Sequence, residues 1–319
     1  MYTDEAVAES RPAFRVGSQS LVAVTDLTKR YARRLAVDRL SLRLRAGEVV
    51  GLVGSNGSGK TTTLRMLAGI LKPDGGHGQV LGFDLMSEAA QIRERAGYMS
   101  QALSLYADLS VFENLRFRAQ VYGLSSPRAA ADAAIADFEL AEFARIPAGR
   151  LSGGWARRLQ LAAALIHSPR LVFLDEPTAG LDALSRHDVW RRIGSLAAAG
   201  AGVIISTHDL AEAERCSFAA LLSEGKIVTA GTPGQIASSA SADAFLLSGR
   251  DARQLAQLVE ATQGVIASYP QGPSLRVVAD PNAEESLSRV ASIHGANVTR
   301  VATRLEDTVL AFSRRRSAE

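Results

Sequence analysis

The chain has 319 residues, of which 47% are hydrophobic and 22% are charged, as expected for a globular protein with an ample core. Its length predicts two domains, or one domain with a large appendage. The net charge of +3 is too small to indicate a nucleic-acid-binding protein, and the single cysteine, Cys216, excludes a disulfide within the chain. No stretch approaches the ~18 consecutive apolar residues of a membrane-spanning helix, so we expect another chain to supply any membrane part of the function.

The N-terminal stretch, residues 1–20, has no periodicity and few bulky apolar side chains, which predicts a disordered leader. Residues 21–24 and 40–44 are strand-like, and the strict alternation of 40–44 indicates an antiparallel strand with one wet face. Tyr31 lies between these two runs. It is either an aromatic platform for an adenine ring or a half-buried surface residue.

The segment from Gly54 to Thr61 fits the pattern G-x-x-x-x-G-K-[ST] at every fixed position. An apolar run, residues 49–53, precedes it, and residues 61–71 carry apolar side chains at helical spacing. The glycines let consecutive backbone N–H groups point inward, and the helix dipole adds positive charge. We therefore predict a phosphate-binding loop in which Lys60 reaches the terminal phosphates and the Thr61 hydroxyl faces Mg²⁺.

Residues 72–78 form a turn cluster, and residues 79–82 and 96–101 are strand-like. Gln101 ends the second of these strands, where its amide either reaches a metal-bound water or is simply solvated. Ser110 and Glu113 form a capping box that opens a helix to about residue 122. Further helical stretches at 128–138 and 141–146 predict a helical insert over about residues 102–150.

Ser152, Gly153 and Gly154 begin an amphipathic helix, which is either an anion-binding geometry or an ordinary cap. Residues 171–174 form an apolar strand that ends in Asp175 and Glu176. A buried strand that presents two carboxylates at its C-terminal edge is the usual place for a ligand site in an α/β sheet. Asp175 would hold Mg²⁺ through water, and Glu176 would orient and deprotonate the attacking water.

Asp182 is a natural N-cap for the next helix, and the buried strand over residues 201–207 is followed directly by His208. Residues 218–229 predict a hairpin, and residues 238–242 a linker of small residues. The order strand, helix, strand, strand, helix, strand over residues 245–301 predicts a ferredoxin-like module, followed by a short helix at 305–312 and a basic tail.

In this order the motifs closely resemble the nucleotide-binding subunit of ABC transporters. Residues 54–61 look like the Walker A motif, 151–154 like the signature motif and 171–176 like the Walker B motif. Gln101 matches the Q-loop glutamine, Leu181 and Asp182 the D-loop, His208 the switch histidine and Tyr31 the adenine-stacking aromatic. The resemblance covers residues 21–238. Residues 305–310 are similar to a C-terminal segment of drug-export ATPases of the daunorubicin-resistance type.

The resemblance implies an α/β P-loop NTPase fold of ABC type with a mixed sheet core, an antiparallel β subdomain and a helical subdomain. It places the ATP-binding domain at 21–238 and a small α+β ferredoxin-like accessory domain at 239–319. The implied catalytic residues are Glu176 and His208, and the implied Mg²⁺ site is made by Thr61, Gln101 and Asp175. The implied ATP-binding residues are Tyr31, Ser55, Asn56, Gly57, Ser58, Gly59, Lys60, Thr61 and Thr62, with Ser152, Gly153 and Gly154 acting in trans.

The implied function is ATP hydrolysis that powers export through a separately encoded membrane permease. The chain would act as a homodimer, or paired with a related ATPase subunit, in the cytoplasm on the inner face of the cell membrane. It would contact the membrane only through its partner and would bind no nucleic acid. One departure is Trp155, which stands where the signature motif usually ends in Gln and which cannot accept a hydrogen bond.

Three alternatives remain open at this point: a soluble ABC-type ATPase that works on ribosomes or DNA, a regulatory ATPase without a transport role, and another P-loop enzyme. The insert lacks the long heptad arms of the DNA-repair type, and the chain carries one such domain where the ribosomal type has two. A kinase or GTPase would leave Ser152, Gly153 and Gly154 unexplained, and the Asn-Lys-x-Asp guanine reader is missing from the sequence.

Overall fold

The computed structural model describes residues 20–32, 34–239, 242–249 and 255–317. The expected leader therefore lies outside the described residues, except for Ser20, which begins the first strand. The chain forms two compact units, one of Met1–Val49 with Thr61–Ile205 and the other of Val50–Lys60 with Ser206–Glu319. Within the described residues, no helix is both long enough and apolar enough to cross a bilayer.

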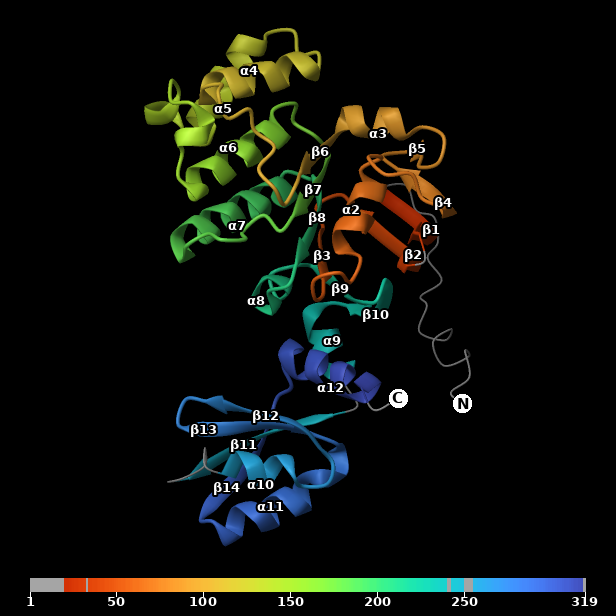
Figure 1. Ribbon diagram of the computed structural model, residues 1–319, viewed down its shortest axis with the longest axis vertical. Helices are drawn as coiled ribbons and strands as arrows, with labels where there is room; N and C mark the ends of the chain where they lie inside the picture. The colour runs from red at the N-terminus through yellow and green to blue at the C-terminus, as the bar shows by residue number, and fades with distance from the viewer. Residues whose placement is uncertain (1–19, 33, 240–241, 250–254, 318–319) are drawn as a thin grey trace. The chain divides into compact units, whose positions relative to one another are not determined.

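The first unit contains an antiparallel sheet in the order β2-β1-β4-β5 (Figure 1). Its strands are β1 (Ser20–Tyr31), β2 (Arg34–Arg45), β4 (Gly75–Val80) and β5 (Phe83–Asp84). Leu40, Leu42 and Leu44 of β2 are buried while Ser41 is exposed, so the predicted antiparallel strand with one wet face is confirmed. Both strands are longer than their sequence patterns, and Tyr31 is the last residue of β1.

The predicted turn over residues 72–78 is wrong in its second half, because Gly75, Gly76 and Gly78 belong to β4. A Cβ atom on Gly76 would lie 2.5 Å from the carbonyl oxygen of Asp26, and one on Gly78 would lie 2.3 Å from that of Ala23. These two glycines are needed because β4 approaches β1 too closely for any side chain. So many glycines in a short stretch are also typical of a turn, which explains the wrong prediction.

The first unit also contains the helices α3 (Ala89–Arg95), α4 (Val111–Val121), α5 (Pro127–Asp137), α6 (Gly153–Leu165) and α7 (Ala183–Ala198), with short 3₁₀ turns at Ala141–Phe143 and Ala148–Arg150. Of these, α4 and α5 form the insert seen in yellow and yellow-green in Figure 1. The capping box is confirmed: Glu113 N–H donates to Ser110 Oγ at 3.2 Å, and Ser110 N–H donates to Glu113 Oε2 at 2.8 Å. The predicted helix at 141–146 is only a single 3₁₀ turn.

A mixed sheet forms the core, with strand order β10-β9-β3-β8-β7-β6. Its strands are β3 (Val49–Val53), β6 (Ala96–Met99), β7 (Leu171–Asp175), β8 (Gly202–Thr207), β9 (Phe218–Ser223) and β10 (Lys226–Gly231). The pairs β3–β9 and β6–β7 are parallel, whereas β9 and β10 form the predicted antiparallel hairpin. Every residue of β3, β7 and β8 is buried, as expected for strands that are covered on both faces.

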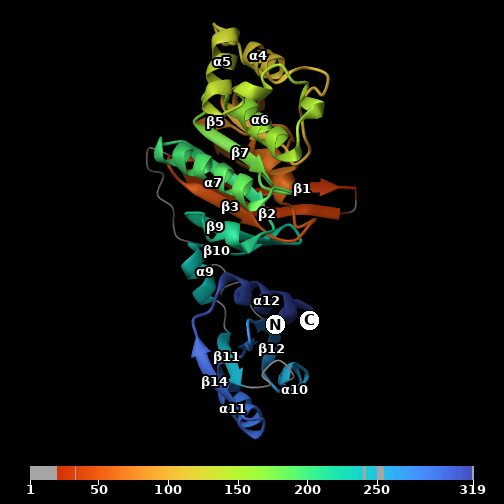
Figure 2. The ribbon, with the colours of Figure 1, turned by 90° about the vertical axis from the view of Figure 1, so that its left-hand side faces the viewer.

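The C-terminal part of the second unit is a βαββαβ module, as the sequence predicted. Its strands, β11 (Asp243–Gly249), β12 (Val265–Gln271), β13 (Ser274–Ala279) and β14 (Ala296–Val301), form an antiparallel sheet in the order β12-β13-β11-β14. Helices α10 (Ala256–Glu260) and α11 (Glu284–Ile293) cover one face, and α12 (Leu305–Ser317) covers the other (Figure 2). Residues 240–241 of the expected linker and 252–254 of the expected first helix lie outside the described residues.

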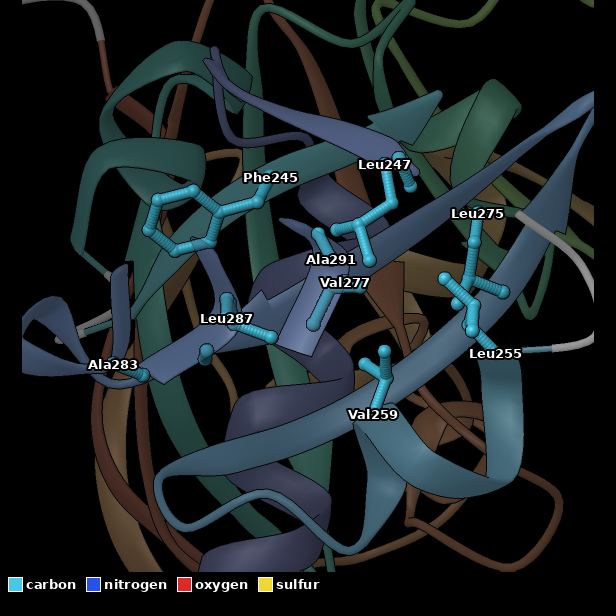
Figure 3. Close-up of a cluster of buried hydrophobic side chains, with 11 residues drawn as sticks. Phe245, Leu247, Leu255, Val259, Leu275, Val277, Ala283, Leu287 and Ala291 are labelled. Atoms are coloured by element: carbon cyan, nitrogen blue, oxygen red, sulfur yellow. The ribbon is translucent and has the colours of Figure 1, made fainter. Parts of the chain in front are cut away.

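The core of this module is made by large aliphatic and aromatic side chains from three strands and both helices (Figure 3). Phe245 and Leu247 of β11 meet Leu275 and Val277 of β13, and all four side chains are fully buried. Leu287 of α11 closes the same cluster. This core is built within the module.

Candidate ATP-binding and hydrolysis site

The predicted phosphate loop follows β3 directly and leads into α2 (Lys60–Leu67). Gly57 and Gly59 have positive φ values of 78° and 106°, which a residue with a side chain rarely adopts. Lys60 is 5% exposed, and its Nζ donates to the carbonyl oxygens of Gly54 at 2.7 Å and Ser55 at 2.9 Å. The ammonium group is thus held inside the curl of the loop, where it can meet an anion.

Two elements of the second unit form backbone hydrogen bonds with this loop. The N–H of Gly54 donates to the carbonyl oxygen of Thr207 at the end of β8, at 3.3 Å. The N–H of Gly225, in the β9–β10 turn, donates to the carbonyl oxygen of Ser58 at 3.0 Å. A Cβ atom on Gly54 would lie 2.3 Å from the carbonyl oxygen of Leu222, so the first glycine of the motif is required by close packing.

In the first unit the structure brings the Walker A hydroxyl to the Walker B carboxylate. Thr61 Oγ1 donates to Asp175 Oδ1 at 3.0 Å, although 114 positions separate the two residues. Asp175 is 1% exposed and ends the fully buried strand β7. A hydroxyl and a carboxylate that present hard oxygen atoms side by side fit the ligand preference of Mg²⁺, so the predicted magnesium site is compatible with the geometry.

The next carboxylate, Glu176, is paired with the Q-loop glutamine. Gln101 Nε2 donates to Glu176 Oε2 at 3.1 Å. Glu176 is 8% exposed and has a φ of 48°, a left-handed conformation that costs a residue with a side chain about 1 kcal/mol or more. The hydrogen bond joins the residue after β7 to the Q-loop, 75 positions away in the sequence.

Sequence reasoning missed two residues that hold the Q-loop. Arg157 donates to the carbonyl oxygen of Ser100 at 3.2 Å, and Gln160 Nε2 donates to the same oxygen at 3.1 Å and to that of Ala102 at 2.9 Å. Both side chains are buried, and Arg157 also donates to Gln160 Oε1 at 3.0 Å. Burial lowers the pKa of Arg157, while the nearby carboxylates of Glu176 and Asp175 act in the opposite direction. The signal in the sequence was a pair of long polar residues three apart on a helix face that is otherwise apolar.

Most of the remaining predicted contacts of ATP are exposed, whereas Ser58 is buried. Tyr31 is 47% exposed, and the Lys29 ammonium lies 6.0 Å from its ring centroid. Ser55, Asn56 and Gly57 are exposed at the tip of the loop, and His208 is exposed directly after β8. Thr62 is half-buried in the first turn of α2.

The signature residues Ser152, Gly153 and Gly154 lie at the N-terminus of α6. Ser152 is the N-cap residue of α6 but makes no capping hydrogen bond with its side chain. Ser152 and Gly154 line a cavity of about 240 Å³ together with Trp155, Asp182 and Ser185. The predicted N-cap role of Asp182 is confirmed, since its Oδ1 accepts the N–H of Ser185 at 2.9 Å.

Trp155, the departure from the usual motif, packs over the first turn of α6. Its ring lies 4.4 Å from that of Phe143, and the Arg158 guanidinium lies 4.7 Å from its ring centroid. Arg158 is in turn paired with Glu139 and Asp188. The indole therefore joins α6 to the helical insert by packing.

A buried strand, a glycine-rich loop and a helix, whose Thr61 hydroxyl donates to the Asp175 carboxylate at the end of a second strand, define a P-loop nucleotide-binding protein. A family model described as ABC transporter matches residues 37–179. The chain is 37% identical over 280 residues to the Nod factor export ATP-binding protein I of Ralstonia nicotianae, an alignment that covers 83% of this chain and 86% of that protein. It is also 37% identical over 227 residues to YbhF of Escherichia coli, a probable multidrug ABC transporter ATP-binding protein, with 70% of this chain and 39% of YbhF covered. The chain thus spans about two fifths of the length of YbhF.

Solved structures agree with these relatives. An ATP-binding subunit of an ABC transporter superposes with a TM-score of 0.63 at 31% identity, over 68% of this chain and 92% of that one. A dimeric ATP-binding cassette in a post-hydrolysis state, bound to ADP and Pi, superposes with a TM-score of 0.62 at 25% identity, over 66% and 98%. The chain belongs to the family of ABC transporter ATP-binding proteins. The predicted ABC-type ATPase fold and class are confirmed at the level of the family.

Proposed function

We propose that this chain is the ATP-hydrolysing subunit of an export system of the drug-export, daunorubicin-resistance type, with ATP-binding and accessory domains divided near residues 238–239. The observation that carries the proposal is the contact of Thr61 with Asp175 beside that of Gln101 with Glu176, because it joins four predicted site residues from distant parts of the sequence. The names of the relatives, a Nod factor exporter subunit and a probable multidrug transporter protein, support an export role.

Each residue then has a chemical role. The backbone of residues 55–59, with Lys60, Thr61 and Thr62, binds the phosphates of ATP, and Tyr31 stacks on the adenine. Thr61, Gln101 and Asp175 hold Mg²⁺, which supplies neutralisation of the phosphate charge. Glu176 accepts the proton of the attacking water, and His208 contacts the γ-phosphate.

The exposed signature residues support a dimer with head-to-tail arrangement. The Ser152 side chain does not cap α6, Ser152 and Gly153 are exposed, and the first backbone N–H groups of a helix have no partner within the helix. We propose that these groups bind the γ-phosphate held by a second copy, or by a related ATPase subunit. ATP then joins the two subunits, and hydrolysis releases them.

A separately encoded permease is the proposed membrane partner, which places the chain in the cytoplasm on the inner face of the membrane. An apolar patch on the helical insert supports this. Leu103, Tyr106, Phe117 and Val121 are 36–60% exposed, and the rings of Tyr106 and Phe117 meet edge to face at 5.0 Å. Contiguous exposed apolar side chains mark interaction surfaces.

The first test is Glu176→Gln in the full chain. We expect ATP to bind as before, turnover to fall at least ~100-fold because the general base is lost, and a dimer to accumulate with ATP in size-exclusion chromatography. Glu142→Gln, on an exposed 3₁₀ turn, is the matched control and should hydrolyse ATP normally. Normal hydrolysis by Glu176→Gln would rule out the proposed role of Glu176.

The second test concerns the partner. A tagged copy is purified from detergent-solubilised membranes, and we expect a multi-span protein in stoichiometric amount. Phe117→Ser together with Val121→Ser should lose that protein while keeping ATP hydrolysis. Recovery with ribosomes or nucleic acid instead would favour a soluble ABC-type ATPase and contradict the export proposal.

A further inference from the structure

The C-terminal helix α12 packs against the part of the second unit that carries the nucleotide loop. Leu305 is 1% exposed and belongs to a buried cluster, and Val309, one helical turn later, is packed against it. The other buried members of the cluster are Val53, Ala213, Ala219, Leu221 and Ile236, and Leu210 and Val228 are packed against it as well. The helix therefore contacts the catalytic domain with its first two turns.

These neighbours belong to elements that adjoin the phosphate loop or His208 along the chain. Val53 is the last residue of β3, directly before Gly54. Leu221 lies on β9, whose turn to β10 holds Ser58 through Gly225. Leu210 and Ala213 belong to α8 (Leu210–Ala213), which begins two residues after His208.

The segment that carries His208 has little stability of its own. Thr207 Oγ1 donates to the buried Glu212 Oε2 at 2.7 Å and accepts the N–H of Asp209 at 2.9 Å. Asp209 in turn caps α8 by accepting the N–H of Ala211 at 2.9 Å. A helix of four residues is unstable unless tertiary packing supports it, and Leu210 and Ala213 of α8 share one apolar cluster with Leu305 and Val309.

The helix α12 is itself anchored on both sides. Asp307 accepts hydrogen bonds from Arg276 Nη2 of β13 at 2.6 Å and from the hydroxyl of Tyr269 on β12 at 2.9 Å. On the side of the catalytic domain, Thr308 Oγ1 donates to the carbonyl oxygens of Ile236 and Ala237, both at 3.3 Å. The position of Leu305 is thus set by the C-terminal module, and a change in that module would move it.

We propose that Leu305 and Val309 are positioning residues for ATP hydrolysis, which hold the Thr207–α8 segment so that His208 faces the nucleotide. This inference rests on the proposed catalytic role of His208. It gives the C-terminal module a function within the ATPase cycle: the module acts on hydrolysis through α12. The affected step is hydrolysis, because the hydrogen bonds that shape the phosphate loop do not involve Leu305.

The test compares Leu305→Ala with Leu287→Ala in the full chain, in ATPase assays well below the melting temperature of each variant. Leu287 is equally buried but lies in the core on the opposite face of the C-terminal sheet. We expect Leu305→Ala to lower kcat about tenfold with the KM for ATP changed less than about twofold, and Leu287→Ala to leave both within about twofold. Leu305→Met, which keeps the volume, should restore kcat.

A double variant separates this inference from the proposed function. If Leu305 acts through His208, then Leu305→Ala should add less than about twofold to the effect of His208→Ala. Additive effects, or a rise in KM in place of a fall in kcat, would overturn the positioning role. Normal turnover by His208→Ala would instead refute the proposed role of His208. If Leu305→Ala does not fold, Val309→Ala replaces it. Val309 is half-buried, and we expect its loss to lower kcat about threefold.

Discussion

The ion pair between Arg276 and Asp307 makes the sharpest stability prediction, because both partners are almost fully buried. Their side chains are 2% and 0% exposed, and the closest pair of atoms is 2.6 Å apart. Asp307 also accepts the N–H of Arg304 at 2.7 Å and the hydroxyl of Tyr269. We predict that Asp307→Asn, which keeps the shape but removes the charge, detaches α12 from the C-terminal sheet.

The magnitude follows from the burial. Removing one partner of a buried pair leaves the other as an uncompensated charge, which costs about 3–5 kcal/mol. Arg276 would keep one neutral partner, the carbonyl oxygen of Ala302 at 2.7 Å, so we expect the lower end of this range, about 3 kcal/mol. Since ~1.4 kcal/mol is a factor of ten, local opening should become about a hundredfold more frequent.

The pair also predicts a dependence on pH. Burial by itself would raise the pKa of Asp307, but the hydrogen bonds from Arg276, Arg304 and Tyr269 outweigh it and the pKa is lowered. The folded state therefore binds this proton less readily than the unfolded state does. The stabilisation is present above the unfolded pKa and is lost as the pH falls through the lower folded pKa.

Hydrogen exchange followed by mass spectrometry is the suitable assay, because it reports on β13 and α12 separately from the rest of a chain that need not unfold in one step. Arg289→Met is the matched control, since its ion pair with Glu285 is 3.4 Å long and its side chain is 74% exposed. We expect the control to change the opening free energy by less than ~0.5 kcal/mol. Unchanged exchange in Asp307→Asn would refute the reasoning that this buried pair holds α12.

Three further predictions concern the first unit. Ser110→Ala removes the capping box and should destabilise α4 by about 1 kcal/mol, measured by hydrogen exchange of Val111–Val121 against Ser292→Ala. Gly78→Ala should destabilise the antiparallel sheet by several kcal/mol, because the new Cβ atom would collide with β1. Gly82→Ala has open space around it and should cost about 1 kcal/mol, and urea denaturation of both variants compares the two free energies of unfolding. Burial lowers the pKa of His167 to about 4, so the folded state binds fewer protons than the unfolded state between about pH 4 and 6.5. The free energy of unfolding should therefore rise with pH in this window, by ~1–2 kcal/mol after solvent screening. His167→Phe, which keeps the stacking on Tyr122, should remove this pH dependence in denaturation curves.

Several features could be predicted because they depend on neighbours in the sequence. The buried strands Val49–Val53 and Leu171–Asp175, the capping box at Ser110, the N-cap Asp182 and the β9–β10 hairpin are each specified by a few consecutive residues. The same holds for the βαββαβ order of the C-terminal module. Local propensity, capping and periodicity act over a few residues, and the family resemblance placed these motifs in one site.

Other features could not be predicted, because they depend on contacts between segments that are distant in the sequence. The glycines of β4 predict a turn from the sequence alone, and only the close approach of β1 explains why they stand in a strand. The residues around Glu176 give no sign of its left-handed φ. Arg157 and Gln160 became recognisable as supports of the Q-loop only once α6 lay beside Ser100, which is 57 positions from Arg157.

The sequence by itself predicted the phosphate-binding loop and determined the class of protein, because both depend on consecutive residues with fixed spacing. The tertiary structure decided which residues the C-terminal segment 305–310 contacts. Leu305 joins the buried cluster that contains Val53, Asp307 pairs with Arg276, and Thr308 donates to a carbonyl oxygen of α9 (Pro233–Ser239). None of these partners can be inferred from the segment, since each lies far away in the chain and its approach depends on the packing of the unit.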